Sequence, residues 1–305
     1  MGSGFAQLFA LAGIATSVVD TSAGRAEQAR AATVEAARRF EAQEMMRAGA
    51  GDVIDAHLSA TGSLAEAVRT ADFVIEAVTE EPAVKRDVLR AIEDATSPGT
   101  LIATNTSAIP IRELAAAFSR PDRFLGTHWF NPPQWVPCVE VVPGPETSPG
   151  AVARATALLE RLGKVPVVVG DKAGFVANRI QFAMFKEAAA VVADGIATAE
   201  DVDAVVRNSF GFRLPFYGPF AIADMAGLDV YAGAYAALEE EFGPRLATPE
   251  LLARLVEQGR LGTKSPEGGF LGVSGDEAAA MAARRDASYV ALSRLLEQLD
   301  ADVAG

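Results

Sequence analysis

The chain has 305 residues, half of them hydrophobic, and a formal net charge of −13. This length allows one large or two ordinary domains with a substantial core. The acidic balance argues against nucleic acid or an anionic membrane surface as partner, and it is ordinary for a soluble enzyme. Nothing in the sequence points to secretion, so a cytoplasmic protein is the default expectation. The single cysteine, Cys138, excludes a disulfide framework and a cysteine metal cluster within one chain. The apolar start, residues 5–19, lacks the features of a signal peptide and is too short to span a bilayer.

Strands and helices alternate through the first part of the chain. Apolar runs predict strands at residues 15–20, 71–78, 100–104, 124–127, 139–142 and 165–169. Helical patterns occur at residues 1–13, 25–47, 109–118 and 151–162, and a further helix opens at Glu80-Glu81-Pro82. This alternation predicts a parallel sheet with helices on both faces. His57 is expected in an exposed polar connection.

The character of the chain changes after Gly170. Helices are predicted at residues 174–193, 199–207, 221–242, 249–258 and 277–304, with a glycine-rich loop at residues 259–272. We therefore expect an α/β Rossmann-like parallel-sheet domain at residues 1–170, followed by an all-α domain at residues 171–305.

Residues 126–143, GTHWFNPPQWVPCVEVVP, contain the first chemical candidate. His128 is one of only two histidines in the chain, and Glu140 follows in a strand-like run. Asn131-Pro132-Pro133 forces a loop between them, which can return the carboxylate to the imidazole. A carboxylate beside an imidazole raises its basicity and fixes its tautomer, as a general base requires. The alternative is a surface histidine in a proline-rich turn.

Polar residues also follow the strand at residues 100–104. Asn105, Thr106 and Ser107 are ordinary helix caps, but open α/β sheets place ligand contacts at the same strand ends. No cluster of side chains has the spacing of metal ligands, so we expect no metal.

The N-terminal segment resembles the second half of a dinucleotide-binding βαβ unit, with a helix that leads to a strand ending in Asp20. The first strand and the first two glycines are not present before Gly2, which corresponds to the third glycine. We expect an upstream strand that ends in G-x-G. The alternative is a helix whose small residues merely pack against a sheet.

The whole chain resembles the 3-hydroxyacyl-CoA dehydrogenase family. The segments that carry the resemblance occur in family order: MGSGFAQ, SVVD, VIEAVTEE, NTSAI, GTHWFNPP, VEVV, GFVANRI and GRLGTKSPEGGF. The resemblance implies an NAD-binding Rossmann-like domain and a helical domain that forms a homodimer contact. It assigns His128 as the catalytic base and Glu140 as its partner, while Ser107 and Asn178 hold the reacting oxygen. The implied cofactor contacts are Gly2, Asp20, Glu80, Lys85, Ser107, Asn131 and Lys264. The acid at position 20 favours NAD over NADP, because a 2′-phosphate would meet a negative charge.

Three features bear on the substrate. PPQWVPCVE, with Trp135 and Pro137, is similar to the branch that contains lambda-crystallin, gulonate 3-dehydrogenase and carnitine dehydrogenase, which act without CoA. FGFRLPFYGPFAIADMAGLDVY and GRLGTKSPEGGF look more like the acyl-CoA enzymes. Arg38 and Arg39 could contact CoA phosphates or could lie on a solvated helix face. We expect NAD-dependent oxidation of the 3-hydroxy group of a short-chain 3-hydroxyacyl-CoA, as in fatty acid metabolism. The alternatives are a dehydrogenase of a free 3-hydroxy acid and a non-catalytic or truncated relative.

Overall fold

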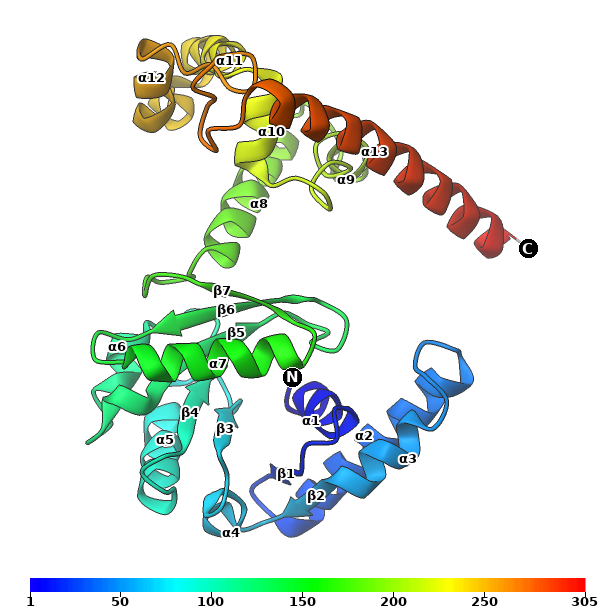
Figure 1. Ribbon diagram of the computed structural model, residues 1–305, viewed down its shortest axis with the longest axis vertical. Coiled ribbons are helices and arrows are strands. Elements are labelled where there is room, and N and C mark those ends of the chain that lie inside the picture. Colours follow the sequence, from blue (N-terminus) through cyan, green and yellow to red (C-terminus); the bar gives the residue numbers. More distant parts are fainter. Residues whose placement is uncertain (305) are drawn as a thin grey trace. The chain divides into compact units, whose positions relative to one another are not determined.

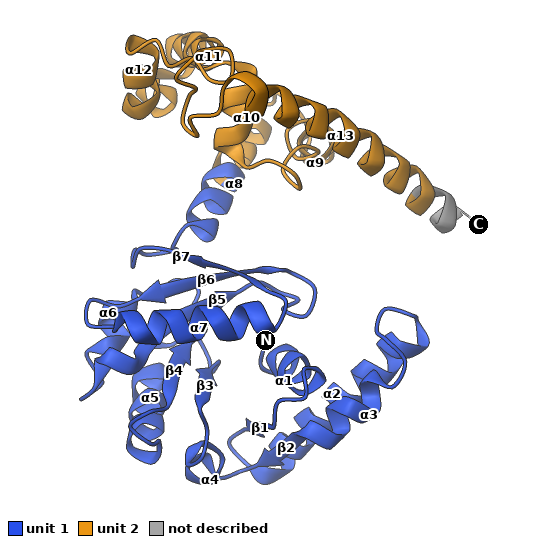
Figure 2. Ribbon diagram, viewed as in Figure 1, with its two compact units in different colours: residues 1–185 blue, residues 186–305 orange. Residues whose placement is uncertain are grey.

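The computed structural model describes residues 1–304, and the chain divides into two compact units, Met1–Phe185 and Lys186–Gly305 (Figure 2). The first unit contains all the described strands, and the second contains helices only (Figure 1). This arrangement confirms the predicted fold class, an α/β Rossmann-like domain followed by a helical domain. The division between the units falls within helix α8 (Ala177–Ala193), and the domain boundary near Gly170 stays a prediction.

The first unit alternates helices and strands along the chain. Its elements are α1 (Gly2–Leu11), β1 (Thr16–Val19), α2 (Ala23–Ala42), α3 (Ala50–His57), β2 (Leu58–Thr61), α4 (Leu64–Val68), β3 (Phe73–Glu76), α5 (Pro82–Ala95), β4 (Leu101–Thr104), α6 (Ile111–Ala115), η1 (Pro121–Arg123), β5 (Phe124–Trp129), β6 (Cys138–Pro143), α7 (Pro149–Arg161), β7 (Val165–Val168) and the start of α8.

The main sheet has the strand order β3-β4-β5-β6-β7. Strands β3, β4 and β5 run parallel, but β5 and β6 pair antiparallel, and β7 is parallel to β6. The prediction of a parallel sheet is therefore wrong for one pair of strands, β5 and β6. The loop of residues 130–137 is too short for the crossover that a parallel pair needs, so the chain returns beside β5 in the opposite direction.

Helices cover both faces of this sheet, as the strand–helix alternation predicted. On one face Leu125 and Val141 pack with Phe5 and Phe9 of α1 and Leu159 of α7. On the other face lie Ile102, Phe124 and Val142, which pack with side chains of α5 and α6. Neighbouring strand residues alternate between these two clusters because successive side chains point to opposite faces of a sheet.

Strands β1 and β2 form a separate parallel pair. Among residues 1–304, β1 pairs only with β2 and β3 pairs only with β4, so each has one edge without a partner strand. An inserted strand between these edges would unite the two sheets. The upstream strand expected from the sequence stays a prediction.

The predicted helix at residues 25–47 ends earlier than expected, and a second helix and a strand follow it. Helix α2 stops at Ala42, and Gly49 adopts the left-handed conformation (φ +78°) at the start of α3. His57 is the last residue of α3 and not part of a polar connection. Strand β2 was missed because its four residues, LSAT, include only one strongly apolar side chain.

The second unit contains the remainder of α8 and helices α9 (Ala199–Asn208), α10 (Pro219–Ala226), α11 (Leu228–Phe242), η2 (Gly243–Leu246), α12 (Glu250–Glu257) and α13 (Gly275–Ala304). The single helix predicted at residues 221–242 is two helices, separated at Gly227, whose φ of +100° no helix can contain. Buried Asp224 accepts the N–H groups of Phe270 and Leu271 at 2.9 Å each, which anchors the predicted loop. Within the described part of the chain, no helix is both long and apolar enough to cross a membrane.

Candidate active site

His128 and Glu140 lie opposite each other on the antiparallel strands β5 and β6. The His128 Nδ1 atom is 2.7 Å from the Glu140 Oε2 atom, and both residues are buried, at 3% and 2% exposure. The loop between the strands therefore does bring the carboxylate back to the imidazole. The aromatic rings of Phe130 and Phe175 lie beside the imidazole, with centroids 4.7 Å and 5.6 Å away.

The carboxylate of Glu140 fixes the tautomer of His128. An ionised carboxylate only accepts hydrogen bonds, so Nδ1 carries the proton and Nε2 keeps its lone pair. No hydrogen-bond partner of Nε2 is found within residues 1–304. Burial alone would raise the pKa of Glu140, but the hydrogen bonds from His128, Ala177 and Val176 outweigh it and hold the pKa below its usual value. The pair can thus accept a proton at Nε2.

The start of α8 joins this pair to the strand-end loop after β4. The Glu140 Oε1 atom accepts the N–H groups of Val176 and Ala177 at 2.9 Å and 3.0 Å. In the same turn, Asn178 donates from Nδ2 to the backbone oxygen of Ser107 at 2.9 Å. The structure therefore brings His128, Glu140, Ser107 and Asn178 into one connected set within the first unit.

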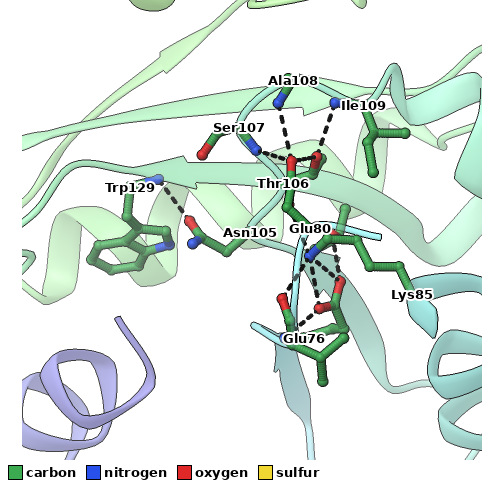
Figure 3. Close-up of polar contacts among 11 residues, drawn as sticks. Glu76, Glu80, Lys85, Asn105, Thr106, Ser107, Ala108, Ile109 and Trp129 are labelled. Carbon is green, nitrogen blue, oxygen red and sulfur yellow. Dashed lines mark hydrogen bonds and ion pairs between the residues drawn. The ribbon is translucent and has the colours of Figure 1, made fainter. Parts of the chain in front are cut away.

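Glu80 holds the loop that contains Ser107 (Figure 3). Its Oε1 atom accepts the Thr106 hydroxyl at 2.5 Å and the N–H groups of Ser107 and Ala108 at 2.9 Å and 3.2 Å. Burial raises the pKa of Glu80, but the hydrogen bonds from Thr106 and Ser107 and the nearby Lys85 ammonium outweigh it, so the pKa lies below its usual value. Lys85, one of the implied cofactor contacts, is 1% exposed, and its ammonium contacts Glu76 and Glu80.

The residues expected to bind the cofactor lie in several places. Asp20 follows β1, and its Oδ1 atom accepts the Thr21 N–H at 2.6 Å and pairs with the Arg25 Nε atom at 3.2 Å. The N–H of Thr21 in particular, with Arg25, lowers the Asp20 pKa. Gly2 begins α1, where an added Cβ would meet nothing within 4 Å. Asn131 is exposed in the loop after β5.

Lys264 belongs to the second unit. Its Nζ atom lies 2.5 Å from the Asp229 Oδ1 atom, a contact that lowers the Asp229 pKa. Its expected contact with the cofactor stays a prediction.

Sequence reasoning missed two residues of this site. Glu76 is buried and takes part in the hydrogen bonds around Lys85, and Phe175 packs beside His128. The acid inside the apolar run ADFVIEAV was an available signal, because a carboxylate buried in a strand needs partners. Cys138 has its pKa raised by burial and by Glu140, which disfavours a thiolate. No cluster of metal-binding side chains occurs in the described residues.

A Rossmann-like sheet that holds a buried His–Glu pair across β5 and β6 makes the chain an α/β protein with a candidate acid–base site. Residues 1–172 match the 3-hydroxyacyl-CoA dehydrogenase NAD-binding domain, and residues 174–271 match the C-terminal domain of the same family. The chain belongs to the 3-hydroxyacyl-CoA dehydrogenase family, whose members are NAD-dependent oxidoreductases that act on CH–OH groups.

Individual relatives differ in substrate. The chain is 35% identical to 5-formyl-3-hydroxy-2-methylpyridine 4-carboxylate 5-dehydrogenase of Mesorhizobium japonicum, over 97% of this chain and 95% of that protein. It is 34% identical to 3-hydroxybutyryl-CoA dehydrogenase of Clostridioides difficile, over 88% and 94% of the two chains. The solved 3-hydroxyacyl-CoA dehydrogenase of Archaeoglobus fulgidus superposes with a TM-score of 0.79 at 31% identity, over 97% and 95% of the two chains.

Proposed function

We propose that this protein oxidises the 3-hydroxy group of a short-chain 3-hydroxyacyl-CoA to the 3-oxo compound, with NAD as the acceptor. The observation that carries the proposal is the 2.7 Å contact between His128 and Glu140, which leaves His128 Nε2 as the free base. The match of residues 174–271 to the C-terminal domain of the acyl-CoA family supports the substrate class.

His128 performs the proton transfer in this proposal. Nε2 takes the proton of the substrate hydroxyl while the hydrogen on the same carbon leaves with its electron pair. Bound NAD supplies the nicotinamide that receives this hydride. Glu140 then faces an imidazolium, whose charge it compensates in a buried site where water cannot.

Ser107 and Asn178 are proposed to hold the reacting oxygen. The N–H of Ser107 is held by Glu80 and its backbone oxygen by Asn178, so the backbone is fixed on both sides while the hydroxyl remains for the substrate. The Asn178 amide uses one N–H of Nδ2 for this bond, which leaves its second N–H to donate to the reacting oxygen. Fixed donors and acceptors of this kind contribute by positioning and electrostatics.

The first turn of α1 and the end of β1 fit a dinucleotide. Within the described chain, the N–H groups of Gly2 and Ser3 have no acceptor, as expected at a helix start that can receive a phosphate. We propose that Gly2 approaches the pyrophosphate and that Asp20 binds the ribose hydroxyls. Glu80, Lys85, Asn131 and Lys264 remain the other proposed contacts.

A free hydroxy acid is the second candidate substrate, and three ion pairs of Arg38 and Arg39 favour it. The Arg38 Nη2 atom lies 3.5 Å from carboxylate oxygens of Asp52 and Asp55, and the Arg39 Nη1 atom lies 3.2 Å from Glu35. Arginines paired in this way offer less positive charge to the phosphates of CoA. The full-length similarity to an enzyme named for a pyridine carboxylate points in the same direction.

NADH formation distinguishes these candidates. The protein is offered 3-hydroxybutyryl-CoA, free 3-hydroxybutyrate, gulonate and carnitine, with His128→Gln as control. A fifth compound is 5-formyl-3-hydroxy-2-methylpyridine 4-carboxylate, which appears in the name of the Mesorhizobium relative. Turnover of the thioester, lost in the variant, is the expected result. Turnover of a free acid alone would replace the main proposal with the second one. A folded chain that binds NAD but turns over none of them would identify a non-catalytic relative.

We also infer a homodimer. Helix α13 carries Leu295, Leu296 and Leu299 at 49%, 42% and 51% exposure, and such apolar stretches usually mark a protein contact. The paired change Leu295→Glu/Leu299→Glu should convert the dimer to a monomer in sedimentation equilibrium. The change Arg294→Glu, at an exposed residue on the opposite face of α13, should not. An unchanged mass for the paired variant would contradict a dimer formed through α13.

A further inference from the structure

Glu76 is a buried carboxylate at the end of β3, with 2% exposure. Its Oε1 atom accepts the Val78 N–H at 2.6 Å and the Lys85 ammonium at 2.9 Å. Its Oε2 atom accepts the hydroxyl of Thr104, the neighbouring residue on β4, at 2.6 Å and lies 3.3 Å from the same ammonium. Removing a carboxylate from water costs free energy unless its oxygens are hydrogen-bonded. The bonds to both oxygens of Glu76 compensate this cost and fix the position of its side chain.

Lys85 links Glu76 to Glu80 (Figure 3). Its Nζ atom lies 2.9 Å from Glu76 Oε1, 3.2 Å from Glu80 Oε2 and 3.2 Å from the Val78 carbonyl oxygen. Two carboxylates thus share one ammonium. The position of Lys85 depends on both of them, because an ammonium is a point charge on a flexible stem that its partners must hold in place.

This series of contacts does not end in the core. It ends at the loop after β4 that contains Ser107, the proposed substrate contact. Glu80 uses its other oxygen for the Thr106 hydroxyl and the N–H groups of Ser107 and Ala108. Thr106 in turn accepts the N–H of Ile109 at 3.0 Å, which closes the turn. Glu76 is therefore connected to the backbone N–H of Ser107 through two charged side chains, those of Lys85 and Glu80.

We propose that Glu76 is a positioning residue for the reaction, which acts through Lys85 and Glu80 to fix the backbone of Ser107. The proposal rests on the proposed role of Ser107 in binding the reacting oxygen. In it, Lys85 and Glu80 also serve to hold the loop, in addition to any contact with the cofactor. Removing the charge of Glu76 leaves Lys85 with one carboxylate partner, so Lys85 moves toward Glu80 and Glu80 loosens its hold on the loop.

The first experiment compares Glu76→Gln with Glu93→Gln. Glu93 is a matched control, because it is also a buried carboxylate that accepts backbone N–H groups, those of Ser119 and Arg120. It lies near the end of α5, whereas Lys85 lies near the start of this helix. In Glu76→Gln we expect amide hydrogen exchange at Ser107 and Ala108 to quicken on the order of tenfold, since hydrogen bonds to a charged group are lost there. Glu93→Gln should quicken exchange at Ser119 and Arg120 only.

Kinetics provide the second readout. A misplaced Ser107 should lower kcat/KM by roughly 10- to 100-fold in Glu76→Gln, mainly through kcat, while Glu93→Gln stays within about twofold of the native value. Equal losses in the two variants would show that Glu76 only supports the fold, and they would overturn the proposal.

A double-mutant comparison tests the route through Glu80. On a Glu80→Gln background the hold on Ser107 is already lost, so adding Glu76→Gln should change exchange at Ser107 by less than about twofold. Additive effects would contradict the relay. These exchange measurements need no turnover, so a protein inactive on every substrate would refute the proposed function and still test the relay.

Discussion

The two carboxylate oxygens of Glu140 bind different groups, one the imidazole of His128 and the other the start of α8. One oxygen lies 2.7 Å from His128 Nδ1, and the other accepts the N–H groups of Val176 and Ala177. The charge that orients the base therefore also fixes the helix that carries Asn178. Any change at Glu140 should affect both the proton acceptor and the proposed substrate contact.

Replacing His128 tests the base directly. His128→Gln keeps a polar side chain of similar size but removes the basic Nε2, so kcat should fall by about 100- to 10,000-fold, the usual contribution of a general base. Steady-state NADH formation measures the loss, and binding of NADH should persist. His57→Gln is the matched control, because within residues 1–304 the His57 ring hydrogen-bonds only the Val53 carbonyl, at 2.8 Å, at the end of α3. Equal activity of the two variants would rule out His128 as the base.

The lowered pKa of Glu140 makes a pH-dependent contribution to stability. A carboxyl group whose folded pKa lies below its unfolded value, here 4.5, stabilises the fold fully above that value and loses the contribution as the pH falls through the folded pKa. The test compares the native protein with Glu140→Gln, so that the hydrogen bonds from His128, Ala177 and Val176 that lower this pKa stay in place in the native protein.

Urea unfolding at about pH 5 and about pH 3 then compares the native protein with Glu140→Gln. The free energy of unfolding should fall more steeply for the native protein, which retains the titrating carboxyl. Parallel declines in the two proteins would mean that Glu140 has an ordinary pKa in the folded state.

The sequence predicted most of the α/β fold because its strands are apolar runs bounded by turn residues. The pairing of His128 with Glu140 was also predictable, since Asn131-Pro132-Pro133 allows only a loop between two strand-like segments. The direction of β6 was not anticipated, because the alternation of strands and helices elsewhere favoured parallel pairing. Strand β2 and the break at Gly227 gave no periodic signal, and a single glycine within an apolar helix is compatible with a continuous helix.

The network around Lys85 shows where sequence reasoning ends. Lys85 lies in the first turns of an amphipathic helix, and a lysine there is usually solvated. It is buried because Glu76 and Glu80 approach it from two other segments, and this convergence depends on tertiary structure. Glu76 itself was visible as an acid within an apolar strand, although its partners were not.

Gly126 is required for the packing between β5 and α6. An added Cβ would lie 2.6 Å from Ile111 Cδ1 and 3.2 Å from Val142 Cβ, and both neighbours are fully buried. Gly126→Ala should therefore lower the free energy of unfolding by about 1–3 kcal/mol, as overpacked cores do. Gly150 in α7 is the matched control, because a Cβ there meets nothing within 4 Å, and Gly150→Ala should be neutral or slightly stabilising. Urea denaturation measures both, and equal stabilities would contradict the steric argument.

Asp20 should decide the choice between NAD and NADP. Its carboxylate can bind ribose hydroxyls and repels a 2′-phosphate, and Arg25 lies 3.2 Å away with its charge compensated by Asp20. In Asp20→Ser the arginine becomes available to a phosphate, so the ratio of kcat/KM for NADP to that for NAD should rise by roughly tenfold or more. The gain should disappear in Asp20→Ser/Arg25→Ala, which retains the serine but lacks the cation. If the ratio rises equally in both variants, Arg25 has no part in the change; if it rises in neither, Asp20 does not contact the ribose.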